Sequence, residues 1–598
     1  MKKIVFLTAL LPMSSFAEIA LDTQKITASK ITNSQVSNSI VITREEIELL
    51  QATNLSEVLS QLPGFQVTQQ GGNANTQSFV MNGFRSSQML ILLNGQRFSS
   101  ATLGSATYNT IPANSIKKIE IVSNARSAIY GADAMGGVIN IVTTQDIAEQ
   151  KLLNNNIHLA LGNQGTSQFS TDLNKTIGDL SLHLSGFTEK TQGYDVYEAN
   201  DSDRDGSERH ALGLDASYKI NNENTLTLTN QNNRGSVDYD GRSGNNHKKD
   251  YQQQVATIGW QYSDEKYGAS ANYGQSFDKS WSYGNGTSRS DANGFITDTK
   301  TIDVSARAKV SEAQTLLVVS DYREDDISKS DNQYDKTNGD TYGFGLSHNY
   351  TTNMVNTELG LRRDDSSLFD ENYSYSASAE WFALEQLSIT AAFNTGFKAP
   401  SFNDLYYPVS GNKDLKPEKS LNRRLAIQYS QDQASYKASY QLSHVDNLIQ
   451  WVPNSGGMWQ PTNVNQALLR NAVLSWDYNW FANFSSQLSY EWNHSVDLKT
   501  HNRLPRQSSR VAKLNLNYDN GQYSVGSSMR YLSESYDNAS NSNLLAAYTV
   551  ADAYAKVSVS ENFSFGLRIN NLTNKTYQSA KGYPAQERTY LVSGTFNF

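Results

Sequence analysis

The chain has 598 residues, of which 38% are hydrophobic and 11% aromatic, and it carries a formal net charge of −9. This negative charge excludes the basic surface typical of nucleic-acid-binding proteins. The absence of cysteine excludes disulfides, thiol chemistry and cysteine-bound zinc.

The first residues predict a secretory signal peptide. Met1-Lys2-Lys3 is basic, Ile4 to Leu11 is almost wholly apolar, and Ser15-Phe16-Ala17 has small residues where signal peptidase cuts. We expect residues 1–17 to be removed after Ala17. Beyond them, no apolar run approaches the roughly 20 residues that a membrane helix needs. The chain is therefore expected to leave the cytoplasm without a helical anchor.

Residues 31–148 predict a small α+β domain. The segment VITREEIELLQATNLSEVLSQLPGF indicates a strand and two helices that end at Pro63-Gly64. MLILLNGQRF indicates a strand and a turn, and IKKIEIVSNARSAIYGADAMGGVINIVTT indicates two strands around a glycine-rich turn.

Residues 149–598 show a different pattern, an alternation with a period of two residues. Leu180, Leu182 and Leu184 fall on one face of a predicted strand, and Leu226 and Leu228 on one face of another. Of the 33 tyrosines only two precede residue 150, and all 8 tryptophans follow it. Aromatic girdles and strands that are apolar on one side are typical of membrane β-barrels.

A soluble β-sandwich of this size would be unusual, so we predict an all-β transmembrane barrel. Residues 151–598 divided by the 22 strands of plugged outer-membrane transporters leave about 20 residues for each strand and its connection. This length fits a membrane strand of roughly 9–11 residues with turns and loops. The α+β domain ahead of such a barrel is expected to lie in the lumen as a plug.

The chain ends on TYLVSGTFNF, with Tyr590, Val592, Phe596 and Phe598 at every second position. We interpret this segment as the last barrel strand, with its apolar side facing lipid. The alternative, an ordinary edge strand, would expose an apolar edge that promotes aggregation. A terminal phenylalanine such as Phe598 resembles the signal by which the barrel assembly machinery recognises outer-membrane barrels.

Over essentially its full length the chain resembles the TonB-dependent outer-membrane receptors. LSEVLSQLPGFQV, MNGFRSSQMLILLNGQRF and IEIVSNARSAIYGADAMGGVINIVTT are similar to successive plug motifs of that family. NTGFKAPSFNDLYYPVSGNKDLKPEKS is similar to its mid-barrel motif, and the last 29 residues to its C-terminal signature. Within the family the chain most resembles the receptors for cobalamin (vitamin B12).

The resemblance implies that the chain works with a periplasmic partner protein, TonB, and that residues 18–30 contain the TonB box, the segment that TonB binds. The TonB box would comprise Asp22, Thr23, Gln24, Lys25, Ile26, Thr27, Ala28 and Ser29. Such a short extended segment can add as a strand to a sheet edge of the periplasmic protein TonB, which is energised by the inner-membrane ExbB–ExbD complex. A disordered tail is the alternative. A monomer surrounded by outer-membrane lipids is expected.

By the same resemblance, the plug positions that align with cobalamin contacts are Thr76, Ser78, Arg85, Leu103 and Gly104. All but Arg85 fall in two polar stretches, residues 71–78 and 100–107, which we expect to be the first and second plug loops. Small and polar residues suit a large, nearly neutral ligand that carries amide groups. Flexible loops without a binding role are the alternative.

An acidic segment after residue 190 predicts a calcium site in the extracellular loops. The candidate ligands are Asp195, Asp201, Asp203, Asp205, Tyr239, Asp240 and Asp250. Clustered carboxylates repel unless a cation joins them, and oxygen-only groups suit calcium. An EF-hand starting at Asp201 is excluded because its twelfth position is Leu212. The family resemblance implies the same calcium role, and a solvated acidic loop is the alternative.

The expected function is TonB-dependent import of cobalamin, without enzymatic activity or a catalytic cofactor. A siderophore receptor of the same family is the main alternative, although residues 195–250 carry 11 acidic and 7 basic residues, a field that opposes an anionic ferric catecholate. A haem receptor would usually have a plug histidine, and residues 18–150 contain none. A passive porin would need neither plug nor TonB box, and no hydrolase constellation indicates an outer-membrane enzyme.

Overall fold

The computed structural model describes residues 39–143, 155–197, 203–241, 246–284, 287–454, 456–481 and 483–598. The predicted signal peptide, the predicted TonB box (Asp22–Ser29) and Asp201 lie outside the described residues. Within those described ranges, no helix is long and apolar enough to cross a membrane.

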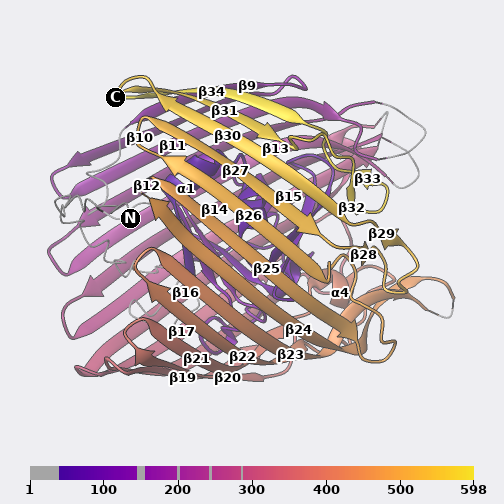
Figure 1. The fold of residues 1–598 in the computed structure, drawn as a ribbon. Coiled ribbons are helices and arrows are strands. Elements are labelled where there is room, and N and C mark those ends of the chain that lie inside the picture. The colour runs from indigo at the N-terminus through magenta and orange to yellow at the C-terminus, as the bar shows by residue number, and fades with distance from the viewer. Residues whose placement is uncertain are drawn as a thin grey trace, which may run out of the picture.

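Antiparallel strands form a closed barrel of 22 members, which confirms the predicted fold class (Figure 1). Each strand pairs with the next along the chain, and β34 closes the ring by pairing with β9. The strands are β9 (Asn156–Gly162), β10 (Ser167–Ile177), β11 (Leu180–Tyr194), β12 (Asp205–Lys219), β13 (Asn224–Asp240), β14 (Asn246–Ser263), β15 (Tyr267–Gly284), β16 (Asn293–Ser311), β17 (Gln314–Asp326), β18 (Asn338–Thr351), β19 (Val355–Ser366), β20 (Asn372–Leu384), β21 (Leu387–Lys398), β22 (Glu418–Gln431), β23 (Ala434–Pro453), β24 (Trp459–Phe481), β25 (Phe484–Asp497), β26 (Arg510–Asp519), β27 (Tyr523–Leu532), β30 (Tyr548–Ser558), β31 (Phe563–Asn570) and β34 (Thr589–Asn597).

The two faces of the barrel wall have the polarity expected of a membrane barrel. On β25 the outward residues Leu488, Tyr490 and Trp492 are exposed, whereas the inward Glu491 and Asn493 are buried. This arrangement is the reverse of a soluble barrel, because the outside faces hydrocarbon and the inside faces a polar lumen.

The connections differ in length at the two ends of the barrel. Residues 178–179 form a tight turn between β10 and β11, whereas residues 399–417 at the opposite end hold α4 (Phe402–Tyr406). The chain ends beside the short turns (Figure 1). Since outer-membrane barrels have short periplasmic turns and longer extracellular loops, the long loops are extracellular. In the described part of these loops the further elements are η5 (Arg289–Asp291), β28 (Ser535–Tyr536), β29 (Leu544–Leu545), β32 (Gln578–Ala580) and β33 (Tyr583–Pro584).

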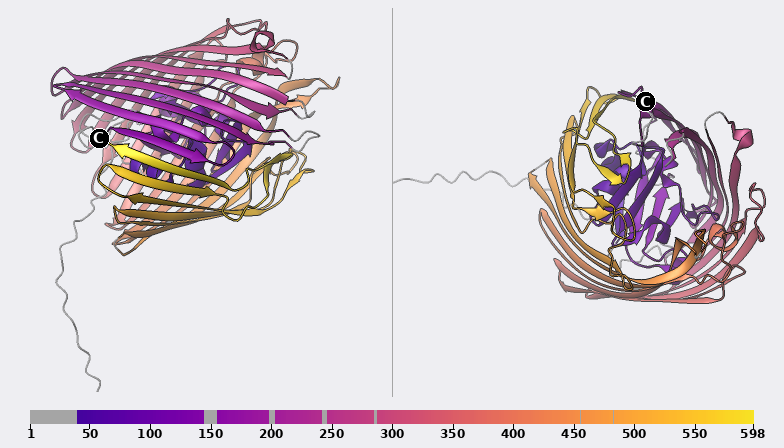
Figure 2. Two further views of the ribbon diagram at one scale, coloured as in Figure 1. Left: turned by 90° about the horizontal axis from the view of Figure 1, so that it is seen from above. Right: turned by 90° about the vertical axis from the view of Figure 1, so that its right-hand side faces the viewer.

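The N-terminal domain lies inside the barrel (Figure 2). It has a five-stranded sheet, ordered β1-β7-β8-β5-β6, and a three-stranded sheet, ordered β2-β3-β4. Its elements are β1 (Ser39–Thr43), α1 (Arg44–Leu50), α2 (Leu55–Gln61), β2 (Phe65–Gln70), β3 (Thr76–Met81), β4 (Phe84–Arg85), η1 (Ser86–Gln88), β5 (Leu90–Leu93), β6 (Gln96–Arg97), η2 (Tyr108–Thr110), η3 (Ala113–Ser115), β7 (Lys118–Val122), α3 (Ser127–Tyr130) and β8 (Val138–Val142).

Local sequence explains the plug elements that we predicted. Thr43 and Glu46 form a capping box that starts α1, and Asn54 caps α2 by accepting a hydrogen bond from the backbone N–H of Glu57. The apolar faces of these helices meet the sheets in one core that includes Leu59 and Phe79. The predicted strand, helix and helix after residue 38 are therefore confirmed.

Buried cations of the barrel wall bind the plug backbone. The ammonium of Lys513 donates to the carbonyl oxygens of Leu62 and Phe65 at 2.6 and 2.7 Å. Arg362 donates to the carbonyl oxygen of Ile129 at 3.1 Å. Each contact gives carbonyl groups of the plug backbone a hydrogen-bond donor from the wall. Hydrogen bonds to the barrel wall therefore hold the plug, in addition to its packing inside the lumen.

We expect deletion of Phe598, or its replacement with Asp, to lower the yield of folded barrel severalfold. Phe598 is 52% exposed on the lipid side and its ring stacks on Phe596, with centroids 5.8 Å apart. A charge on this face is costly and the stacked pair is lost. The matched control is Asn597→Asp, on the other face. Heat-modifiable gel mobility measures folding, and equal yields of both variants would contradict the strand assignment.

Candidate functional site

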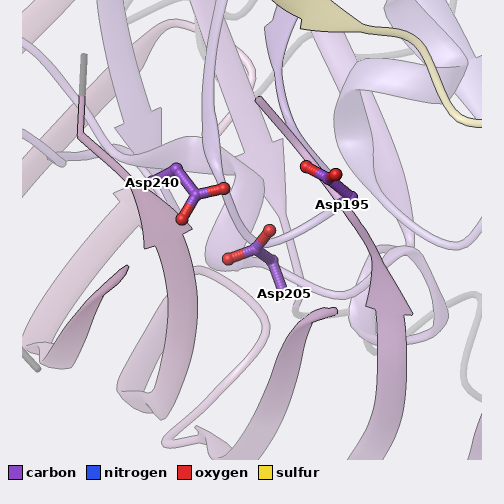
Figure 3. A group of neighbouring side chains, drawn as sticks. All are labelled: Asp195, Asp205 and Asp240. Carbon is purple, nitrogen blue, oxygen red and sulfur yellow. The ribbon is translucent and has the colours of Figure 1, made fainter. Parts of the chain in front are cut away.

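Three carboxylates converge at the extracellular ends of neighbouring strands (Figure 3). Asp195 follows β11, Asp205 begins β12 and Asp240 ends β13. One carboxylate oxygen from each lies within 4.8 Å of the others. Asp205 and Asp240 are buried, at 5% and 1% exposure. The ladder of β11, β12 and β13 brings together residues that are up to 45 positions apart in the sequence (240 minus 195).

An irregularity in the β11–β12 ladder positions this cluster. The register shifts between Thr191 and Tyr194, and Gly193 lies between them with φ of +64°. A Cβ atom on Gly193 would come within 1.8 Å of the carbonyl oxygen of Asp205, so no other residue fits without a local shift. The bulge turns the chain so that the backbone N–H of Val196 donates to the Asp205 carboxylate at 3.0 Å.

The electrostatics of the cluster favour a cation. Asp205 lies at the extracellular edge of its strand, beyond the apolar band of the wall. Burial, together with the neighbouring Asp240, Asp203 and Asp195 and against the hydrogen bond from Val196, raises the pKa of its carboxyl to about 7. Three acidic groups in this space repel one another, and a hard cation with oxygen ligands would remove that repulsion.

The other predicted calcium ligands lie at varying distances from the cluster. Asp203 is close enough to raise the pKa of Asp205, but it is not one of the three converging residues. The ring of Tyr239 stacks on His247, with centroids 5.4 Å apart. Asp250 lies opposite Ser236, four positions along β13 from Asp240, and accepts a hydrogen bond from Tyr283 at 3.3 Å. The structure therefore does not bring Asp250 to the cluster.

The predicted ligand positions of the plug fall in two places. Thr76 and Ser78 lie on β3 rather than in a loop, and Arg85 is half-buried at the end of β4. Leu103 is 48% exposed at the tip of the second loop, and Gly104 beside it has φ of +63°. Residues 71–75 form the loop that their polarity predicted, but from Thr76 onwards the stretch pairs with β2 and is a strand.

A hydrogen bond connects the plug to the acidic cluster. The side-chain amide of Asn75, which precedes Thr76, donates to the carbonyl oxygen of Asp238 on β13 at 3.1 Å. Asp238 is two residues from Asp240. Asn75 therefore joins the plug to the same strand end that bears Asp240.

The second plug loop is held by an extracellular loop. Backbone N–H groups of Phe402 and Asn403 donate to the carbonyl oxygens of Ala101 and Thr102 at 3.0 and 3.1 Å. These two bonds fix the two residues that directly precede the exposed Leu103. The pairing leaves the Leu103 side chain about half exposed.

Aromatic residues around α4 form a part of the candidate site that the sequence did not predict. Tyr407 lies 6.3 Å from both Tyr334 and Trp451, measured between ring centroids. The indole of Trp451 donates to Asp404 at 3.0 Å. The residues come from three extracellular segments, and only the run Leu405-Tyr406-Tyr407 gave a local sign of an aromatic surface.

Comparisons with known proteins match both parts of the chain. A family model described as "TonB dependent receptor-like, beta-barrel" matches residues 151–572, and one described as "TonB-dependent Receptor Plug Domain" matches residues 31–138. The vitamin B12 transporter BtuB of Photobacterium profundum is 30% identical, covering 100% of both chains. That of Vibrio vulnificus strain YJ016 is 27% identical, covering 96% of this chain and 95% of its own.

Solved structures share the fold at lower identity. The siderophore receptor PirA from Acinetobacter baumannii has a TM-score of 0.80 at 17% identity, covering 94% of this chain and 99% of its own. The FrpB iron transporter from Neisseria meningitidis has a TM-score of 0.81 at 13% identity, covering 94% and 100%. At these identities the likeness concerns the architecture alone.

Proposed function

Since the chain belongs to the TonB-dependent receptors of the outer membrane, we propose that it imports cobalamin. The proposal of cobalamin as the ligand rests on the similarity, over the full length, to relatives named vitamin B12 transporters. Members of the family are receptors and transporters rather than enzymes, so the residues discussed here bind and move but do not catalyse.

The proposed ligand surface is the extracellular side of the plug with its surrounding loops. Leu103 and Gly104 would contact cobalamin from the second plug loop, and Thr76 and Ser78 from β3. Arg85 is the fifth predicted contact. The aromatic group around Tyr407 offers flat apolar faces beside these positions, which suits a large ring system with polar edges.

Ligand binding would be coupled to energy through the N-terminus. TonB would capture Asp22–Ser29 as an added strand and pull on it, with inner-membrane proton flow through ExbB–ExbD as the source of energy. Because the plug is bonded to the wall by contacts such as those of Lys513, the pull must break those contacts before a path opens.

A siderophore is the second candidate, since the structural neighbours include siderophore and iron receptors. Equilibrium binding to the purified full-length receptor tests the two. We expect saturable binding of cyanocobalamin and no measurable competition by ferric enterobactin. Tight binding of the siderophore without binding of cyanocobalamin would overturn the proposed ligand and leave the family assignment intact.

Calcium is the cation we propose for the acidic cluster. Asp195, Asp205 and Asp240 supply oxygen ligands only, from three adjacent strands, and calcium takes 6–8 oxygens in flexible geometry. The ion would neutralise the mutual repulsion of the three carboxylates. Asp203, two residues before Asp205, and Tyr239, directly before Asp240, would be further ligands, whereas Asp250 lies opposite Ser236 and outside the converging group. Asp201 lies outside the described residues.

We expect calcium to tighten cobalamin binding by about 5- to 150-fold, the usual range for coupled sites. Ordering the loops beforehand removes an entropy cost that cobalamin would otherwise meet. Magnesium should substitute poorly because it requires a smaller octahedron and retains its water. The measurement is cobalamin titration in chelator, in calcium and in magnesium.

The double variant Asp205→Asn/Asp240→Asn should bind cobalamin with the same affinity in all three buffers. That affinity should equal the affinity of the wild type measured in chelator. Asp250→Asn is the matched control, because it removes a carboxylate from the same hairpin but outside the cluster. It should respond to calcium like the wild type. If the wild type itself binds cobalamin equally in the three buffers, the cluster is only a solvated acidic loop.

A further inference from the structure

The outer wall of the barrel contains a hollow that the import function does not use. It has a volume of about 350 Å³ and lies over β16, β17, β18 and β19. Its apolar lining comes from Ile302, Val304, Tyr322, Tyr342 and Phe344, with Ser320 among them. These side chains belong to the lipid-facing series of their strands, and most are strongly exposed. The hollow therefore opens into the membrane and not into the lumen.

The strand register explains why the surface is concave here. Val304, Ser320 and Phe344 are directly opposite one another across β16, β17 and β18. Ser320 is much smaller than its two neighbours, so the wall is depressed at that point. The next row towards the extracellular end of the strands holds Tyr322 and Tyr342. Their ring centroids are 4.8 Å apart, and the two rings bound the hollow on its extracellular side.

A charged row lies above the hollow, on its extracellular side. It holds Lys300 and Glu324, which are opposite each other and have charged atoms 3.5 Å apart. On β19, Arg363 and Asp365 are opposite Phe344 and Tyr342, so they line one flank of the hollow itself. The guanidinium of Arg363 is 3.2 Å from Asp365 and 3.0 Å from Glu371, and all these side chains are substantially exposed. An apolar hollow with a charged row above it and one charged flank has the polarity of a lipid molecule in the outer leaflet.

We propose that this hollow binds one acyl chain of an outer-leaflet lipid, whose head group lies against the charged row. A chain in the hollow contacts Val304, Phe344 and the tyrosine pair on three sides, whereas a chain on the flat wall is contacted on one side. More apolar surface is buried per methylene group, so residence there is favoured. The cation–anion pairs offer both signs of charge to the polar head.

Another protein chain is a poorer occupant. A stable protein interface buries about 800 Å² on each partner, and the hollow is bounded on its extracellular side by charges that would have to be desolvated. The lipid needs no such desolvation, because its own head group remains at the aqueous boundary. The location on the outer wall also separates this site from the proposed cobalamin surface.

Photo-cross-linking tests the proposal on the full-length receptor in phosphatidylcholine vesicles. The probe is phosphatidylcholine with a diazirine on its acyl chain, and cross-linked peptides are identified by mass spectrometry. We expect the β17 and β18 peptides to be enriched over the rest of the wall by roughly four- to fifteenfold, since one or two additional buried methylene groups change a binding constant by about that factor. Uniform labelling around the barrel would overturn the proposal.

Two variants and a matched control locate the acyl chain. Ser320→Leu fills the hollow and should abolish the enrichment. Ala306→Leu adds the same bulk to the exposed face of β16 outside the hollow and should retain it. Phe344→Ala, which removes one wall, should lose it as well. Heat-modifiable mobility verifies folding of each variant. Enrichment that survives both Ser320→Leu and Phe344→Ala would also overturn the proposal.

Discussion

Replacing Ile26 with proline should reduce cobalamin uptake to background while surface binding stays at the wild-type level. In the proposed mechanism TonB holds residues 22–29 as an added strand, through hydrogen bonds of the backbone. Proline removes one backbone donor and fixes φ, so it interrupts that strand. Binding is spared because the proposed ligand surface is on the opposite, extracellular side of the plug.

The measurement is uptake of labelled cobalamin by cells, with binding measured on the same cells after their energy supply has been poisoned. Ile26→Ala is the matched control, since it removes the side chain and keeps the backbone donor. It should retain most of the uptake. A parallel loss of binding and uptake in Ile26→Pro would contradict the added-strand mechanism.

Replacing Arg362 with methionine should destabilise the receptor by about 3–5 kcal/mol, the typical cost of removing one partner from a buried ion pair. Arg362 is 3% exposed. Its guanidinium is 2.7 Å from both Asp321 and Asp364, and it also donates to the plug at Ile129. The variant removes the cation that is hydrogen-bonded to both carboxylates and the donor to one plug carbonyl.

The adjacent Arg363 provides a matched control. It also pairs with two carboxylates, but its side chain is 53% exposed on the outer wall. Exposed pairs contribute about 0–1 kcal/mol, so Arg363→Met should leave the melting midpoint nearly unchanged. The measurement is the temperature at which heat-modifiable mobility is lost. Equal midpoints for the two variants would show that Arg362 does not fix the plug.

Much of the fold could be predicted because its signals are local. A period of two residues, as in Leu226 and Leu228, is visible within one segment and is confirmed as β13. The same is true of the chain end, confirmed as β34. The plug helices have their capping residues in the sequence itself. None of these predictions required knowledge of which strands are neighbours.

The site was harder to predict because it depends on register. Asp195, Asp205 and Asp240 converge only through the ladder and the bulge near Gly193. Nothing near Asp250 indicates that its partner across the ladder is Ser236. Likewise Lys513 binds a plug carbonyl 451 positions away, and no periodicity reveals such a contact.

The pairing of β34 with β9 also has a consequence for the order in which the protein can be made. Leu591 lies opposite Gly162, so the ring cannot close until nearly the whole chain has been synthesised. Until then β9 and β31 are unpaired edges, which other chains can add to. Bringing such distant segments together is also slow, because loop closure costs entropy before any contact repays it. The unfinished chain therefore needs protection from the ribosome to the membrane, and a truncation before Thr589 should leave an open, aggregation-prone sheet rather than a smaller barrel.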